Sequence, residues 1–177
     1  MATQLDPIER AEQASPKLAP VKGLLILGAV AVVMGLFLAL SYALGITQTW
    51  VAFLFTLFWG TEKLKFDKLS ACVLGALTGL VVAYALHELL AVFGPAGLAL
   101  VMGVIVAMVY CAIMQWLAVA INTTCWAFLT IGAAPVIQAQ DEFRGLFAAL
   151  ALGVIYFAGL AWLAQLFMKR AAAKTKA

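Results

Sequence analysis

The chain has 177 residues, of which 66% are hydrophobic and 11% are charged, and its mean hydropathy is +1.09. This balance excludes a water-soluble globular domain, in which about a quarter of the residues are charged. The net charge is +3, and no charged residue lies within 23–61, 89–140 or 145–168. We therefore interpret the basic residues as a membrane-topology signal and not as a nucleic-acid surface.

The two ends of the chain differ from its middle in composition. Residues 1–21 carry both signs of charge and three prolines, and the apolar run that begins at Gly23 is too long for a signal peptide. We expect a polar cytoplasmic tail over 1–21, with one short helix at Asp6–Gln13. Residues 169–177 carry four positive charges and no negative one, which predicts a basic cytoplasmic tail.

The middle, residues 22–168, is the predicted transmembrane domain. Four of its segments are long enough to cross a bilayer alone: Gly23–Leu44, Leu69–Phe93, Gly97–Ala120 and Gly145–Met168. Two shorter apolar segments lie between them, at Trp50–Gly60 and Cys125–Ile137, and we expect Gly132 and Pro135 to interrupt the second. A helix of the length of the first is about 16 Å long, whereas a bilayer core is about 30 Å thick.

The short segments either cross the membrane or re-enter on one side, and charge discriminates between these alternatives. With six crossings and a cytoplasmic N-terminus, ten of the eleven Lys and Arg are cytoplasmic. With two re-entrant segments, seven of these basic residues are cytoplasmic and four are on the outer side. The positive-inside rule favours six crossings with both ends cytoplasmic, and five crossings is the main alternative.

An internal repeat relates the two halves of the domain, residues 22–93 and 97–168. "ITQTWVAFLFTLFW" (46–59) aligns with "INTTCWAFLTIGAA" (121–134) at an offset of 75, with five identities in fourteen positions. Each half reads as a long helix, a Thr-rich turn, a short helix, a charged loop and a long helix. Three spans are an odd number, so the second copy enters from the opposite side. We predict an all-α integral membrane protein, a six-helix bundle built from two inverted three-helix repeats.

Small residues spaced four apart form stripes on the long helices, where another backbone can approach closely. The third and sixth spans have them at repeat-related positions, at an offset of 74: Ala71, Gly75, Gly79 and Gly145, Ala149, Gly153. The first and fourth spans have stripes at Ala31, Gly35, Ala39, Ala43 and at Ala99, Gly103, Ala107, Cys111. We interpret all four as helix-packing faces, although chance ladders also arise in helices rich in Gly and Ala.

The second half also resembles a known family. "WAFLTIGAAPVIQAQ" (126–140) and "ALALGVIYF" (149–157) are similar to the small bacterial inner-membrane proteins of the YcdZ type, a domain of unknown function. The likeness spans roughly residues 50–168 and is carried by apolar residues and glycines. It implies a bacterial inner-membrane location and supplies no site residue. The long N-terminal tail departs from the family pattern.

Matched short segments in two inverted halves indicate a solute path. The candidates for this path are Thr56, Thr130, Trp50, Trp126 and Pro135. Each has a structural alternative: Thr hydroxyls bond to their own helix, and Trp residues form an interfacial belt. His87 and Glu88 are candidates for an outer mouth, unless the span ends before them and both side chains are simply hydrated.

The charged groups suggest a passive role. No Asp, Glu, Lys or Arg is expected at mid-membrane depth, which argues against an ion-coupled pump. The loops at 62–68 and 141–144 mix both signs, which is typical of hydrated loops, with a charge-selective vestibule as the alternative. Cys72, Cys111 and Cys125 read as small packing residues.

We predict a channel or facilitator for a small neutral or weakly polar solute, with the lipid bilayer and other copies of the chain as partners. The alternative is a non-transporting accessory or scaffold protein that associates through its Gly/Ala faces. The single histidine and the absence of any catalytic motif argue against an enzyme. We expect no cofactor, no metal and no nucleic-acid partner.

Overall fold

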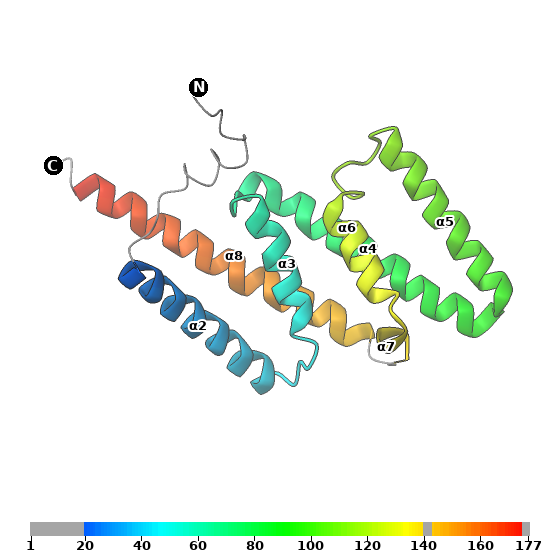
Figure 1. Cartoon of the computed structure of the whole chain (residues 1–177), viewed down its shortest axis with the longest axis horizontal. Helices are drawn as coiled ribbons and strands as arrows, with labels where there is room; N and C mark the ends of the chain where they lie inside the picture. Colours follow the sequence, from blue (N-terminus) through cyan, green and yellow to red (C-terminus); the bar gives the residue numbers. More distant parts are fainter. Residues whose placement is uncertain (1–19, 140–142, 175–177) are drawn as a thin grey trace, which may run out of the picture. The chain divides into compact units, whose positions relative to one another are not determined.

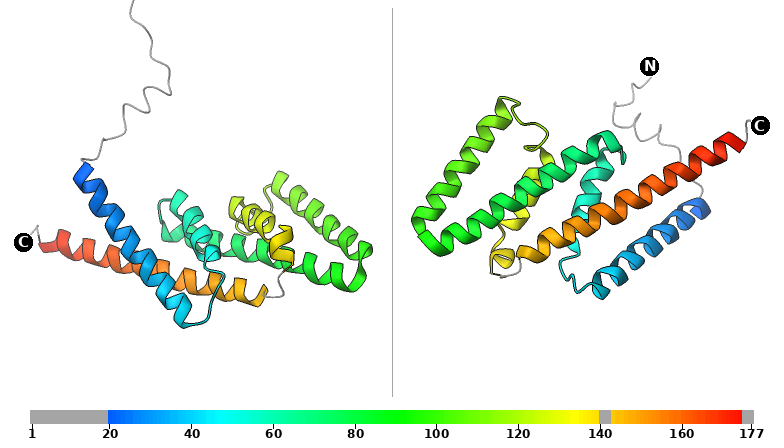
Figure 2. Two further views of the ribbon diagram at one scale, coloured as in Figure 1. Left: turned by 60° about the horizontal axis from the view of Figure 1, so that its bottom comes forward. Right: turned by 180° about the vertical axis from the view of Figure 1, so that it is seen from behind.

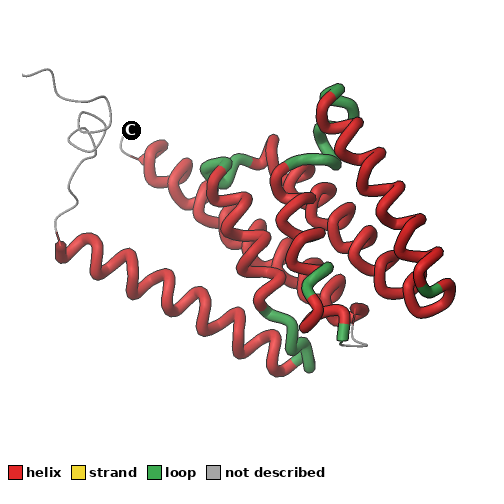
Figure 3. The backbone as a smooth tube through the Cα atoms, turned by 45° about the vertical axis from the view of Figure 1, so that its right-hand side comes forward, coloured by secondary structure: helices red, strands yellow, loops and turns green. Residues whose placement is uncertain are grey.

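The computed structural model describes residues 20–139 and 143–174, and within these ranges every regular element is an α-helix (Figure 1). The helices are α2 (Pro20–Ala43), α3 (Trp50–Thr61), α4 (Phe66–Phe93), α5 (Pro95–Ile113), α6 (Thr123–Gly132), α7 (Pro135–Gln138) and α8 (Phe143–Lys174). Figure 3, coloured by secondary structure, shows helices joined by short loops along this part of the chain. The helix expected at Asp6–Gln13 lies outside the described residues.

Four of these helices are long and apolar enough to cross a membrane. The candidate spans are Val21–Ala43, Phe66–Phe93, Pro95–Ile113 and Phe143–Arg170. α3 and α6 are apolar but shorter, with 12 and 10 residues. The prediction of an all-helical chain with four long apolar spans is thus confirmed, and this composition indicates a membrane protein.

The chain divides into two compact units, residues 1–40 and 41–177. The described part of the first unit is α2 up to Leu40. Its apolar side chains are widely exposed; Leu24, Leu25 and Leu27, for example, are 70%, 71% and 64% exposed. A helix with this surface requires an apolar surrounding, such as lipid.

In the second unit each short helix lies along a long one. α6 packs along α4, and α3 packs along α8. The two views in Figure 2 keep these pairs side by side. α5 folds back along α4 after a tight turn at Gly94, whose φ of +56° is strained for any residue with a side chain.

Glycine makes these close approaches possible. A Cβ atom at Gly79 would overlap the backbone of α6 at Cys125 and would lie 2.9 Å from the Leu129 nitrogen. At Gly153 a Cβ would overlap Ala52 of α3, lying 2.9 Å from its Cα. Both helix pairs are therefore in backbone-level contact, as small residues allow. The other predicted packing residues lie in the same contacts: Ala149 is fully buried, Gly75 faces the side chain of Asn122, and Gly145 faces that of Gln48.

Several element boundaries differ from the sequence prediction; α8, for example, continues to Lys174 and does not end at Met168. α5 ends at Ile113 rather than at Ala120, because Gln115 and Leu117 adopt positive φ values of 57° and 54°, which end a right-handed helix. The segment Cys125–Ile137, predicted to be interrupted at Gly132 and Pro135, consists of α6 and α7 with a break between them. Pro135 lacks an amide donor and forces the preceding Ala134 into an extended conformation with ψ of 139°, so the helix stops and restarts there.

Candidate functional site

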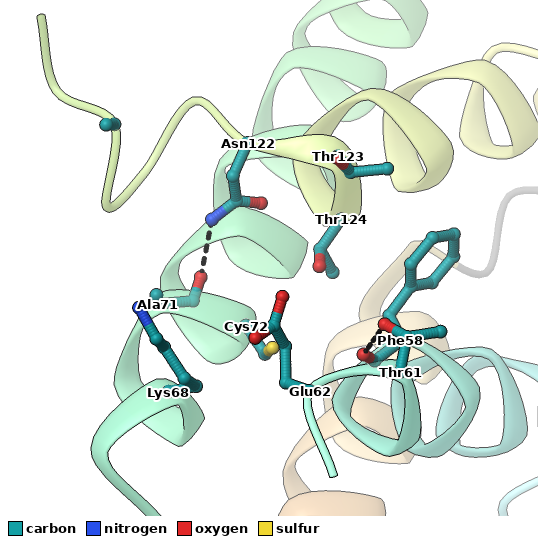
Figure 4. A pocket seen from close by; sticks show the side chains of 10 residues that line it. Phe58, Thr61, Glu62, Lys68, Ala71, Cys72, Asn122, Thr123 and Thr124 are labelled. Carbon is teal, nitrogen blue, oxygen red and sulfur yellow. Dashed lines mark hydrogen bonds between the residues drawn. The ribbon is translucent and has the colours of Figure 1, made fainter. Parts of the chain in front are cut away.

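A polar pocket lies where three helix ends meet in the second unit (Figure 4). It is bounded by the C-terminal end of α3, the N-terminal end of α4 and the segment that leads into α6. Its volume is about 320 Å³. The lining residues are Phe58, Thr61, Glu62, Lys68, Ala71, Cys72, Ala118, Asn122, Thr123 and Thr124.

Asn122 fixes the α6 side of the pocket. Its Oδ1 accepts a hydrogen bond from the backbone N–H of Cys125 (3.1 Å), which caps the start of α6. Its Nδ2 donates to the carbonyl of Ala71 (2.9 Å) on α4. One side chain therefore begins the short helix and ties it to the long helix beside the pocket. Gly75 leaves the room that this side chain occupies.

The turn between α3 and α4 fixes the opposite side. Trp59 is fully buried, and its Nε1–H donates to the carbonyl of Lys65 (2.9 Å) across the turn. Lys63 and Leu64 both adopt positive φ, 56° and 53°, so the chain reverses sharply between the helices. Glu62 lies at the start of this reversal, and its side chain is directed into the pocket (Figure 4).

Charged and neutral polar groups share the pocket. The Glu62 carboxylate lies near Cys72 and Thr124, and the Lys68 amino group lies across the pocket on the Ala71 side (Figure 4). Within residues 20–139 and 143–174, neither charged side chain forms a hydrogen bond or an ion pair. Cys72 and Thr124, each 5% exposed, form the closed part of the wall. The arrangement offers a hydrogen-bond acceptor, a donor and hydroxyl groups to a small polar molecule.

The residues predicted to line a solute path do not line this pocket. The hydroxyls of Thr56 and Thr130 donate to carbonyls of their own helices, at Ala52 and Trp126, each at 2.8 Å. Thr130 is also exposed on the outside of α6. This is the structural alternative considered for both threonines.

The tryptophan and proline candidates lie at helix starts. Trp50 begins α3, and its Nε1–H donates to the Gln48 side chain (2.9 Å). Trp126 is half-buried in the first turn of α6, and Pro135 is exposed at the first position of α7.

His87 and Glu88, the candidates for an outer mouth, lie near the other end of α4. The Nδ1 atom of His87 lies 3.1 Å from the carbonyl oxygen of Gln138 in α7, and its ring lies 5.0 Å from that of Phe143. The Gln138 side chain in turn donates to the Ala83 carbonyl (3.1 Å) on α4. His87 thus belongs to a junction that joins α4, α7 and α8, while Glu88 is exposed.

Sequence reasoning missed the pocket itself. The mixed charges of 62–68 were read as a hydrated loop with a vestibule as the alternative, and two of the pocket residues, Glu62 and Lys68, belong to that loop. The run Asn122-Thr-Thr before an apolar segment is a helix-start signal that could have located the other wall. Within the described ranges, no three residues of the types His, Cys, Asp and Glu are grouped so as to hold a metal ion.

Comparisons of the chain with protein-family models, with curated proteins and with solved structures find no match. The resemblance to the YcdZ type stays a prediction. The pocket and the pairing of short with long helices are therefore the observations that bear on function.

Proposed function

We propose that the protein is a channel or facilitator for a small polar solute, and that the pocket is one mouth of its path. One observation carries this proposal. The pocket lies between the end of one short helix and the start of the other, so the two short segments that suggested a path meet at a polar opening. In transport proteins, short or interrupted helices at matching places in two repeats point to the solute path.

The proposed architecture is a bundle of six crossing helices in two inverted repeats, α2–α3–α4 and α5–α6–α8. The helix pairing supports it, because each short helix packs on the last helix of the other half: α3 on α8, and α6 on α4. An exchange of this kind is what a two-fold relation between the halves produces.

Individual contacts recur at the offset of 74 residues found in the sequence. The Asn122 side chain bonds to Ala71, and the Gln48 side chain lies 3.6 Å from the Cβ position of Gly145. Likewise, Gly79 lies against α6 and Gly153 lies against α3. These paired contacts support the assignment of α3 and α6 to equivalent places.

The proposed orientation decides on which face of the membrane the pocket opens. With both termini in the cytoplasm, α3 ends and α6 begins on the cytoplasmic face, so the pocket opens there. The resemblance to bacterial inner-membrane proteins makes that membrane the proposed location. The basic residues around the pocket, Lys63, Lys65 and Lys68, are on the side that the positive-inside rule requires.

Transport across reconstituted vesicles tests the proposal. We would reconstitute the protein in liposomes and follow stopped-flow light scattering after osmotic shocks with water, glycerol, urea, ammonia and small amino acids. Thr123→Trp and Thr130→Trp form a matched pair, because both threonines are exposed on α6 but only Thr123 lines the pocket. We expect Thr123→Trp to slow permeation at least fivefold and Thr130→Trp to leave it unchanged.

Two results would contradict this proposal. Rates equal to those of empty liposomes for every solute would exclude a passive path for those solutes. A block by Thr130→Trp alone would place the path along the outside of α6 and away from the pocket.

A second candidate, an accessory protein that associates through a helix face, has one observation in its favour. Ala99, Gly103 and Ala107 on the small-residue stripe of α5 are exposed, and a Cβ at Gly103 would have nothing within 4 Å. Cys111 lies on the same stripe. If copies associate there, oxidation of a variant with Cys72→Ser and Cys125→Ser in membranes gives a disulfide-linked dimer, and Gly103→Leu abolishes it. A chain that stays monomeric on oxidation would exclude this face as the contact.

A further inference from the structure

We infer that the pocket recognises a small zwitterion, a molecule with an ammonium group and a carboxylate or phosphate group a few bonds apart. The inference rests on the proposed function and names its class of solute. The same chemistry occurs in free amino acids and in the headgroup of phosphatidylethanolamine, so the experiment must separate these two sources.

Glu62 supplies the site for the cationic end. Its carboxylate is directed into the pocket and has no donor within the described residues. Around it, Cys72 and Thr124 are almost fully buried and close the wall. Glu62 is itself exposed, so its carboxylate can bind an ammonium group from the open side of the pocket through charge-assisted hydrogen bonds, which are about twice as strong as neutral ones.

Lys68 supplies the site for the anionic end. The Lys68 amino group lies across the pocket from Glu62, toward Ala71. The Lys68 ammonium group has three N–H donors, which bind a carboxylate or phosphate through charge-assisted hydrogen bonds.

The two opposite charges also make the binding of simple ions less favourable than that of a zwitterion. A cation that reaches Glu62 has Lys68 across the same pocket, and an anion at Lys68 faces Glu62. Each simple ion therefore leaves one pocket charge unpaired or repelled, whereas a zwitterion satisfies both, and such mismatches are a common basis of specificity. The volume of about 320 Å³ lies at the lower end for ligand pockets, which favours a molecule the size of a small amino acid.

Protection of a cysteine reporter tests the inference independently of transport. Ala118 is exposed and lines the pocket, so Ala118→Cys in a background of Cys72→Ser, Cys111→Ser and Cys125→Ser carries one reactive thiol there. We would measure its rate of labelling by N-ethylmaleimide in phosphatidylglycerol vesicles. The added molecules are glycine and β-alanine as zwitterions, ethylammonium and acetate as simple ions, and urea as a neutral solute.

We expect saturating glycine or β-alanine to slow labelling at least tenfold, and the other three molecules to slow it less than twofold. Glu62→Gln and Lys68→Gln should each raise the concentration for half-protection about tenfold, as expected for the loss of one hydrogen bond to a charged group. Glu88→Gln and Lys63→Gln are the matched controls, because neither residue lines the pocket, and both should leave protection unchanged. Equal protection by acetate or ethylammonium, or full protection in Glu62→Gln, would overturn the inference.

Two further measurements distinguish a free zwitterion from a lipid headgroup, and the zwitterion inference from the proposed facilitator. Slow labelling in phosphatidylethanolamine vesicles without added solute would assign the zwitterion to the lipid headgroup. Protection by glycine without any permeation in the light-scattering assay would support zwitterion recognition and refute the facilitator. Permeation of urea or glycerol that Thr123→Trp blocks, without protection by any zwitterion, would support the facilitator and refute the inference.

Discussion

The two short helices are held on their long partners by different forces. α6 is fastened to α4 by hydrogen bonds near both ends, from Asn122 to the Ala71 carbonyl (2.9 Å) and from Gln138 in α7 to the Ala83 carbonyl (3.1 Å). The contacts described between α3 and α8 are apolar: Gly153 lies against Ala52, and Phe53 lies 6.4 Å from Phe157, centroid to centroid.

This difference has a physical consequence in a membrane. Lipid is as apolar as a leucine side chain, so apolar contact alone gives little preference for protein over lipid, and close packing and hydrogen bonds decide which helices associate. The α4–α6 pair has both, whereas the contacts described for the α3–α8 pair are close packing of apolar groups. We therefore expect α6 to be held more firmly than α3.

The largest expected effect comes from filling the glycine contacts. Gly79→Ala places a methyl group against the backbone of α6, which cannot move aside alone, and should lower the free energy of unfolding by about 3 kcal/mol. Gly153→Ala meets mainly the Ala52 methyl group and should cost about 1.5 kcal/mol. Unfolding in mixed micelles, followed by circular dichroism as a denaturing detergent is added, measures both.

The control and the rescue sharpen this prediction. Gly103→Ala has open space around it and should change stability by less than about 0.5 kcal/mol. Ala52→Gly should recover more than half of the loss in Gly153→Ala, because it removes the obstructing methyl group. Equal losses at Gly79 and Gly103 would show that the α4–α6 contact does not depend on the glycine.

The second-largest expected effect comes from removing the hydrogen bonds that Asn122 makes at the start of α6. Asn122→Ala removes the helix cap and the bond to α4, each worth about 1 kcal/mol, so we expect a loss of about 2 kcal/mol. Asn122→Asp keeps the capping oxygen and loses the donor, and should cost about half as much. Gln48→Ala, at the corresponding place before α3, removes the acceptor for Trp50 and should cost less than Asn122→Ala, which also removes a helix cap. The same unfolding assay applies, and equal costs at Asn122 and Gln48 would contradict the difference between the two pairs.

The third effect concerns the other end of α6. The Gln138 side chain donates to the carbonyls of Gly132 (2.7 Å) and Ala83 (3.1 Å), so Gln138→Met leaves both without this donor. We expect a loss of about 1 kcal/mol and faster amide exchange over residues 133–139. Hydrogen exchange detected by mass spectrometry gives the local readout. Gln115→Met is the matched control, because it loses a bond only to the Ala112 carbonyl in its own turn, and exchange over 133–139 should then be unchanged.

The four long helices were predictable from the sequence because length and the lack of charge decide membrane spans. The break before α7 was also predictable, because Pro135 lacks an amide donor and interrupts the second short segment. The partners of α3 and α6 were not predictable, since a side chain such as Ala52 is equally suited to lipid or to a protein neighbour. The pocket was hidden for a different reason: the chain reverses after Glu62 through positive φ values at Lys63 and Leu64, and neither residue type signals that conformation.

The smallest expected effect tests the apolar pair directly. The rings of Phe53 and Phe157 meet at 58°, a tilted arrangement of the kind that aromatic pairs favour. A double-mutant cycle with Phe53→Leu and Phe157→Leu should give a coupling energy of about 0.5 kcal/mol, because much of each ring's contribution is area that leucine also covers. The same cycle for Tyr84→Leu and Phe143→Leu, whose rings lie 5.6 Å apart between α4 and α8, is the reference. A coupling above about 1.5 kcal/mol for the first pair would exceed the usual range for aromatic pairs, and the apolar contact of α3 would then be as strong as the polar fastening of α6.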